Sequence, residues 1–221
     1  MMNNGSAHTS VGAWLAAAAL LLIAALALHP PPPAGAPAFM DLIADEGATW
    51  VVAHWIAAGA LAAFVVTGLL ALTAPASANK VPRSAWAILS VGALATMVTA
   101  VSEATAVSHV AAEGDLATFM AWERFAAGMS MGFVLMGLAF AGIAWQQARA
   151  QTPSVPRWSA RVAALAGAVS SLAWVLVVAA DVGPAGPVWL VSAVLVSLWL
   201  AWYGFSLMRA AAVPHGRSTH A

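Results

Sequence analysis

Six long apolar stretches, separated by short polar connections, are the feature that most constrains how this chain can fold. They run over 11–28, 50–72, 85–107, 118–145, 159–180 and 187–208. Each is close to the roughly 20 helical residues that cross a bilayer. None shows a two-residue alternation of polar and apolar side chains, so helices rather than a β-barrel must satisfy the backbone in lipid. The sequence therefore predicts an all-α, polytopic integral membrane protein, a six-helix bundle that forms one transmembrane domain.

The low charge content supports the same class. Only 7% of the 221 residues are charged, whereas about a quarter are charged in a soluble globular domain. This composition excludes an ordinary cytosolic enzyme, and the short connections leave no room for a separate soluble domain. The chain has no cysteine, which excludes disulfides and thiolate metal sites.

The charged residues are sorted between the two sides of the predicted bundle. Seven of the eight basic residues lie on one side: Lys80, Arg83, Arg149, Arg157, Arg161, Arg209 and Arg217. The eighth is Arg124, and all eight acidic residues lie toward the other side: Asp41, Asp45, Glu46, Glu103, Glu113, Asp115, Glu123 and Asp181. Because Lys and Arg near helix ends are retained in the cytoplasm, we expect a multi-pass protein of the cytoplasmic (inner) membrane, with both termini cytoplasmic and the acidic side outside.

The first stretch has a second interpretation, a cleaved signal peptide. The small residues of AGAPA, at 34–38, follow it and resemble a cleavage site. However, the leader MMNNGSAHTS contains no Lys or Arg, and the apolar run exceeds the usual signal core of about 7 to 15 residues. We expect this helix to be retained.

A shift of 69 residues aligns the segment 53–69 with the segment 122–138. The two segments share the spacing Gly, Phe, Gly, at 59, 64 and 68 in the first and at 128, 133 and 137 in the second. In addition, Val-Pro-Arg precedes both the third and the fifth stretch. We interpret this pattern as a tandem helix-hairpin repeat, 50–107 and 118–181, flanked by the first and last helices.

The repeat places polar residues at one depth, just inside the acidic side. His54 aligns with Glu123, and Glu103 reaches the same depth from the end of the third stretch. Thr99 lies one helical turn before Glu103, on a face of small and polar residues. The candidate residues for ligand binding, or for a polar layer, are therefore His54, Thr99, Glu103, Glu123 and Arg124, and no residue is assigned a catalytic role.

A purely structural interpretation of this layer competes with a binding site. Adjacent residues on a helix do not face the same partner, so Glu123 and Arg124 must point in different directions. Arg124 is expected to pair with Glu103 or, as the alternative, to reach outward, with His54 hydrogen-bonded nearby. The fourth stretch is longer than a hydrocarbon core of about 30 Å requires, so its first turns can stand in the headgroup region, where charges cost less.

Three kinds of chemistry remain open for the layer. His with carboxylates suits zinc, iron or manganese, which makes His54, Glu103 and Glu123 weak candidates for a divalent metal site. Haem held by two histidines is a second option, although His54 is the one histidine clearly inside a predicted helix. Passage of protons or small solutes uses buried acids and histidines in the same way. Neither haem nor a metal is favoured as a cofactor.

After the prolines that follow His29, the segment 39–46 combines apolar and acidic residues. We expect it to lie flat on the outer surface as a short amphipathic turn that covers the polar layer.

The chain has no basic patch for nucleic-acid binding. The expected function is that of a non-catalytic cytoplasmic-membrane component, which binds a partner subunit, a second copy or a small ligand through its outward-facing polar layer. The alternatives are a membrane oxidoreductase subunit or a metal- or haem-dependent enzyme that uses His54, Glu103 and Glu123, and a proton-coupled small-solute transporter.

Overall fold

The computed structural model describes residues 4–31, 33, 35–74 and 81–212, a part of the chain that is helical and contains no strand. Its elements are α1 (Asn4–Leu28), α2 (Ala36–Asp45), α3 (Gly47–Thr73), α4 (Arg83–Ser102), the π-helix η1 (Glu103–Val107), α5 (Ser108–Glu113), α6 (Leu116–Ser130), α7 (Gly132–Arg149), α8 (Arg157–Ala180) and α9 (Ala185–Ala212). Six helical spans are long and apolar enough to cross a membrane. The predicted six-helix membrane bundle is confirmed.

At the acidic side, the third and fourth helical spans extend beyond the apolar stretches that the sequence predicts. The third span runs from Arg83 to Glu113 without a break, because α4, η1 and α5 follow one another directly, and the fourth runs from Leu116 to Arg149 through α6 and α7. The sequence prediction ended the third helix at Val107. The helix continues because the next residues bury Val110 and Ala111, and it ends at Gly114, whose φ of 73° is left-handed.

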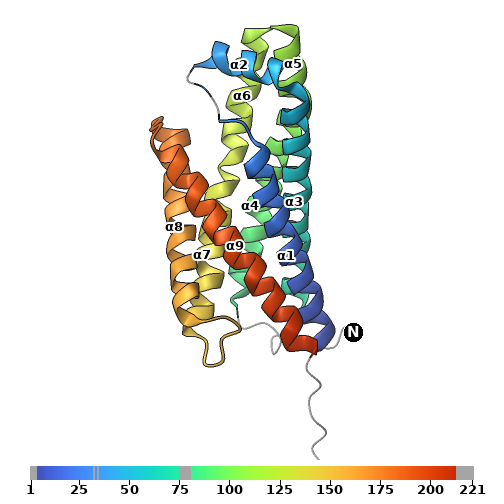
Figure 1. Ribbon diagram of the computed structural model, residues 1–221, viewed down its shortest axis with the longest axis vertical. Helices are drawn as coiled ribbons and strands as arrows, with labels where there is room; N and C mark the ends of the chain where they lie inside the picture. The colour runs from blue at the N-terminus through green and yellow to red at the C-terminus, as the bar shows by residue number, and fades with distance from the viewer. Residues whose placement is uncertain (1–3, 32, 34, 75–80, 213–221) are drawn as a thin grey trace, which may run out of the picture.

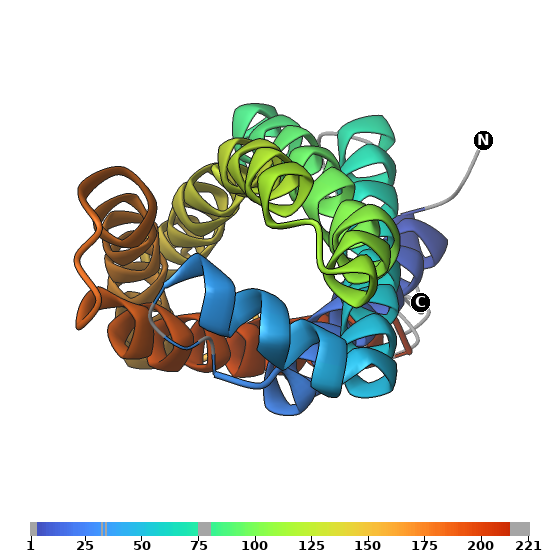
Figure 2. The same cartoon turned by 90° about the horizontal axis from the view of Figure 1, so that it is seen from above.

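The six spans form a closed ring in chain order (Figure 2). α3 packs between α1 and α4, α7 between α4 and α8, and α9 between α8 and α1. Every span therefore has two neighbours, and the first and last helices complete the ring. Asp115 starts the fourth span by capping α6: its carboxylate accepts hydrogen bonds from the backbone N–H groups of Ala117 and Thr118, each 3.1 Å long. Hydrogen bonding by Thr118 lowers the pKa of Asp115.

Close helix crossings in the ring occur at glycines, which have no side chain to keep the two backbones apart. A Cβ on Gly92 of α4 would lie 2.7 Å from the carbonyl oxygen of Gly132 in α7, and a Cβ on Gly167 of α8 would lie 2.7 Å from that of Gly137. Gly12 and Gly204 make the equivalent contact between α1 and α9. Inside lipid the hydrophobic effect does not drive helices together, so van der Waals packing at such close crossings drives their association.

The two ends of the bundle differ in charge and in shape. Arg83, Arg149, Arg157, Arg161 and Arg209 lie at one end, which we call the basic end; Asp41, Asp45, Glu46, Glu113, Asp115 and Asp181 lie at the other, the acidic end. In Figure 1 the acidic ends of α3, α5 and α6 rise above the turn between α8 and α9. The bundle is therefore taller on one side of the ring.

Helix α2 lies across the acidic end (Figure 2). Its residue Ile43 is fully buried, and its Phe39 ring packs at 5.5 Å from Trp50 of α3 and at 5.9 Å from Phe119 of α6, centre to centre. Residues 39–46 were expected to form a covering segment. Residues 39–45 belong to helix α2, which ends at Asp45 and adds a small apolar cluster above the main core.

Candidate functional site

Glu103 and Glu123 meet at the acidic end, beneath α2. Glu103 is the first residue of η1 and is only 6% exposed, and Glu123 is a half-buried residue of α6. Their carboxyl groups interact directly. The sequence placed the two acids at one depth, and in the structure their side chains are in contact.

One oxygen of each carboxyl group lacks a hydrogen-bond donor. Oε2 of Glu103 and Oε1 of Glu123 are shielded from solvent, and neither has a hydrogen-bond partner among the described residues. Two carboxylates in contact repel each other, and burial removes the water that would screen that repulsion. The arrangement therefore favours a positive charge between the two groups, either a proton or another cation.

Glu103 lies where α4 continues into the π-helix η1, one turn after Thr99 on the same helical face. A π-helix adds one residue to a helical turn and changes the direction of the side chains that follow. On the turn before it, Thr99 donates a hydrogen bond of 3.0 Å to the carbonyl oxygen of Ala126 in α6. This bond ties α4 to α6 next to the carboxyl pair, so Thr99 has a positioning role, and its hydroxyl is directed to the backbone of α6 rather than to either acid.

Arg124 lies outside the site. It is exposed and makes no ion pair with any described residue, so the predicted Glu103–Arg124 ion pair is wrong. The reason is helical geometry: consecutive residues point about 100° apart, and because Glu123 faces Glu103 inside the bundle, Arg124 faces outward.

Trp50 joins the carboxyl pair to two histidines. Its side chain is 1% exposed and lies against the Glu103 carboxyl group, although its Nε1 makes no hydrogen bond of ordinary geometry among the described residues. The ring centre of Trp50 is 4.4 Å from that of His54 and 4.7 Å from that of His29. The polar layer is therefore a cluster of aromatic, imidazole and carboxyl groups.

Each histidine of this cluster is oriented by a backbone carbonyl group. Nδ1 of His54 lies 2.9 Å from the carbonyl oxygen of Trp50, and Nδ1 of His29 lies 2.8 Å from that of Pro30. A carbonyl oxygen only accepts hydrogen bonds, so each Nδ1 carries the proton and each neutral ring has its lone pair on Nε2. Burial lowers the pKa of His29 from its ordinary value, against the opposing effect of the hydrogen bond to Pro30.

Sequence reasoning omitted His29 and Trp50 from the site. The signal that could have found His29 was its depth in the membrane. His29 directly follows the first apolar stretch, and His54 lies in the first turns of α3, so both lie near the acidic end. The prolines after His29 suggested a chain that leads away, yet the His29 and His54 rings are 5.1 Å apart, centre to centre.

The predicted metal and haem ligands are not brought together. No group of three or more His, Asp or Glu residues in the described part of the chain is placed to hold a metal ion, so His54, Glu103 and Glu123 do not form the expected triad. The two histidines are also too close to flank one haem iron, because axial imidazoles with iron–nitrogen bonds of about 2 Å have ring centres about 6 Å apart.

Sequence reasoning also overlooked a G-x-S-x-G match, at residues 128–132. A nucleophile elbow needs a strand before the serine and a helix after it, whereas Ser130 lies where helix α6 meets helix α7. Its hydroxyl donates to the carbonyl oxygen of Ala127 at 2.7 Å and accepts from Nε1 of Trp174 at 3.3 Å. No histidine is among these partners, so the serine serves helix packing.

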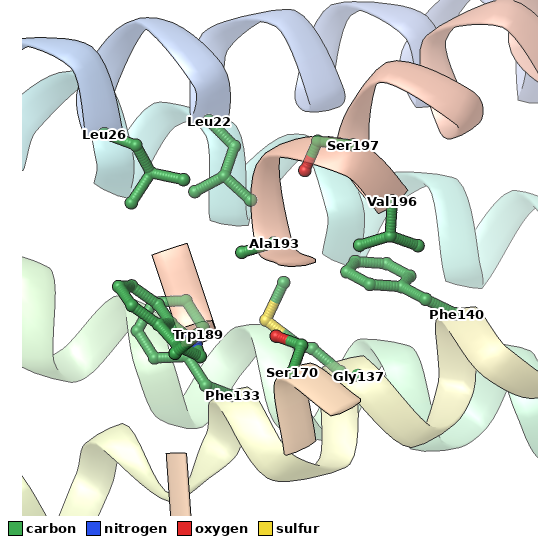
Figure 3. A pocket seen from close by; sticks show the side chains of 11 residues that line it. Leu22, Leu26, Phe133, Gly137, Phe140, Ser170, Trp189, Ala193, Val196 and Ser197 are labelled. Carbon is green, nitrogen blue, oxygen red and sulfur yellow. The ribbon is translucent and has the colours of Figure 1, made fainter. Parts of the chain in front are cut away.

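A small cavity lies deeper in the ring, between α1, α7, α8 and α9 (Figure 3). Its volume of about 10 Å³ is close to the minimum that holds one water molecule. Ser170 and Ser197 lie among largely apolar side chains around it, and the buried Oγ of Ser197 has no partner among the described residues. This cavity is too small for an organic ligand.

Comparisons of the whole chain with models of protein families, with curated proteins and with solved structures return no match. Any function must therefore be argued from the geometry of this chain.

Proposed function

We propose that this protein is a non-catalytic component of a cytoplasmic membrane that binds a small cation at the Glu103–Glu123 carboxyl pair. The observation that carries the proposal is that two acids whose side chains are in contact each keep a buried oxygen without a hydrogen-bond donor. A positively charged ligand would supply both the missing donors and the missing charge.

The charge distribution supports an orientation with the site outside. Arg83, Arg149, Arg157, Arg161 and Arg209 gather at the basic end, and the described acidic residues gather at or near the other end. Retention of basic connections in the cytoplasm then gives two cytoplasmic termini and an outward-facing acidic end.

The surroundings of the pair favour an ammonium ion over a larger or purely polar ligand. An ammonium group offers up to three hydrogen-bond donors, which two carboxylates can accept. α2 covers this end of the bundle, which limits the ligand to a small size. We expect a primary ammonium compound with a short apolar chain.

The test is a calorimetric titration of the protein, in lipid nanodiscs at neutral pH, with methylammonium and ethylammonium. Binding should weaken at least ten-fold in Glu103→Gln and in Glu123→Gln. The exposed Glu113 belongs to the same end, so Glu113→Gln is the matched control and should bind like the parent protein. Absence of binding in the parent protein, or equal binding in all four proteins, would overturn the proposal.

The tandem-repeat interpretation also belongs to this proposal. Gly68 in α3 and Gly137 in α7 are the equivalent residues of the two predicted repeats. A Cβ on either would meet a serine side chain of the next span, Ser90 in α4 and Ser171 in α8 respectively. The two glycines therefore share a position in the repeat and a close approach to the next span, which supports an origin of both hairpins from one ancestral hairpin.

A partner subunit or a second copy would contact the taller side of the bundle. Thr118, Trp122 and Phe125 line a groove on the exposed face of α6. Since α8 and α9 end lower in Figure 1, no described span of this chain covers that face. Single cysteines at Trp122 should cross-link to a neighbouring chain in the membrane, whereas cysteines at Leu165, an exposed residue of α8, should not.

A proton-coupled transporter is the second candidate, and the same carboxyl pair favours it, since two acids in contact bind and release a proton together. In sealed vesicles this candidate predicts a solute flux that acidifies one side and that Glu123→Gln abolishes. Ammonium binding without any flux would leave the binding component as the function.

A further inference from the structure

We propose that His29 and His54 form a binding site for a borderline transition-metal dication at the acidic end, separate from the carboxyl pair. The site joins the end of α1 to the second turn of α3, two segments that sequence reasoning kept apart. It requires no residue of the Glu103–Glu123 pair.

The first observation is the protonation pattern of the two rings. A metal-binding histidine commonly donates one ring N–H to a backbone carbonyl group, which leaves the other nitrogen free to bind the metal. Both rings show this arrangement, His54 toward Trp50 at 2.9 Å and His29 toward Pro30 at 2.8 Å. Neither Nε2 makes a hydrogen bond with another described residue. Two neutral imidazoles therefore offer two unused lone pairs.

The second observation is their separation. Two imidazoles whose nitrogens each lie about 2 Å from one ion, at a nearly tetrahedral angle, have ring centres about 5 Å apart. The measured separation is 5.1 Å, with 66° between the ring planes. Rigid elements hold both rings, because His54 stands inside α3 and His29 is held between the end of α1 and the proline that follows it.

The third observation is the chemistry of the surroundings. Imidazole nitrogen binds Zn²⁺, Cu²⁺ and Ni²⁺ and is a poor ligand for Mg²⁺ and Ca²⁺. Two imidazoles leave at least two positions of a tetrahedral ion to water or to an incoming ligand, which is the open arrangement of exchangeable sites. His29 is half-buried beside the exposed Pro31, so an ion can enter from the acidic side. Affinity should follow the order Cu²⁺ above Ni²⁺ and Zn²⁺.

The experiment is a titration of untagged, detergent-solubilised protein with Cu²⁺, Zn²⁺ or Mg²⁺, combined with pulsed EPR of the copper form. The parent protein should bind one Cu²⁺ and show coupling to two imidazole nitrogens. His29→Gln and His54→Gln should each weaken copper binding at least ten-fold and remove one of the two couplings. Because His54 is buried, each variant is checked for its helix content and thermal unfolding.

Two controls separate this site from other donors. His109 is exposed and pairs with Glu113, so His109→Gln should leave the copper affinity and both couplings unchanged, and so should the tail variant His215→Gln/His220→Gln. Glu103→Gln, which should weaken ammonium binding at least ten-fold, should leave copper binding intact. The proposal is overturned if the parent protein binds no copper, if it shows a single nitrogen coupling, or if His29→Gln retains the parent affinity and both couplings.

Discussion

The middle of the ring and its acidic end are built on opposite principles. In the middle, glycines bring helix backbones together, and hydroxyls such as Thr96 and Ser171 donate to carbonyl oxygens of their own helices. At the acidic end, Glu103, Glu123 and Trp50 are buried with polar atoms that have no partner in the described structure. The middle is close-packed, and the Ser197 hydroxyl at the small cavity is its exception to hydrogen bonding, whereas the acidic end gathers two carboxyl oxygens and one indole N–H without partners in the described structure. This difference assigns stability to the first region and ligand binding to the second.

The largest expected effect is a loss of unfolding free energy when a close helix crossing in the middle of the ring is disrupted. A Cβ on Gly132 would collide with backbone and side-chain atoms of Gly92 and Thr96, so Gly132→Ala should cost about 3 kcal/mol of unfolding free energy. A Cβ on Gly128, one helical turn earlier, would meet nothing within 4 Å. Gly128→Ala should therefore be neutral or gain up to about 1 kcal/mol. Urea or SDS unfolding measures both, and equal losses in the two variants would refute the close crossing.

A smaller effect is expected on the docking of α2 at the acidic end. Ile43 is the fully buried residue of α2, and Ile43→Ala should weaken its docking by about 2 kcal/mol. Hydrogen exchange in α2 should then accelerate while exchange in α7 and α8 stays unchanged. The exposed Asp41 of the same helix supplies the control, since Asp41→Asn should leave exchange in α2 as it is. Faster exchange throughout the bundle would mean that α2 is part of the main core.

Removing one acid from the pair should stabilise the ligand-free protein. The amide of Glu103→Gln can donate a hydrogen bond to Glu123, so the pair no longer needs a proton or another cation between its two side chains, and this should gain about 1 kcal/mol. Thermal unfolding without ammonium ions measures the gain, and the exposed Glu113→Gln should show none. A loss of stability in Glu103→Gln would show that a partner already satisfies the Glu103 carboxylate. Such a gain at the expense of binding is typical of functional sites.

The smallest effect concerns the pH dependence of stability. The pKa of His29 is lowered in the folded protein by burial, from an ordinary value of 6.5. The unfolded chain therefore takes up a proton first as the pH falls, and the contribution of His29 to stability is present above pH 6.5 and is lost below it. Unfolding measured from pH 7.5 to pH 5 should show a shallower slope in His29→Gln than in the parent protein. Identical slopes in the two proteins would contradict the burial of His29.

The membrane fold was predictable because its cause is local. Each apolar stretch must become a helix in lipid whatever its neighbours do, so the six spans follow from composition alone. Their ends were predicted less well, since the extension of the third span to Glu113 depends on contacts of Val110 and Ala111 with other helices. Ring order and the positions of the close crossings also depend on contacts between spans.

The site was predicted in part, for reasons that concern geometry. Helical depth placed His54, Glu103 and Glu123 in one layer, and helical periodicity explained why Glu123 and Arg124 diverge. It did not tell which of the two faces Glu103, because the rotation of α6 about its own axis is set by its contacts with α4 and not by the local residue pattern. Opposite charge suggested Arg124 as the partner, whereas packing of α6 against α4 turns Glu123 inward. The place of His29 in the site was missed because a run of prolines predicts where a helix ends but does not predict the contacts of the residue before it.

The most direct measurement is cross-linking of cysteine pairs, which the absence of native cysteine makes simple. A short bifunctional thiosulfonate reagent should join Glu103→Cys to Glu123→Cys in the membrane, with high yield. The pair Glu103→Cys with Arg124→Cys differs by one position and should remain unlinked, because Arg124 points outward. Efficient linking of the second pair and none of the first would contradict a shared carboxyl site and restore the ion pair between Glu103 and Arg124.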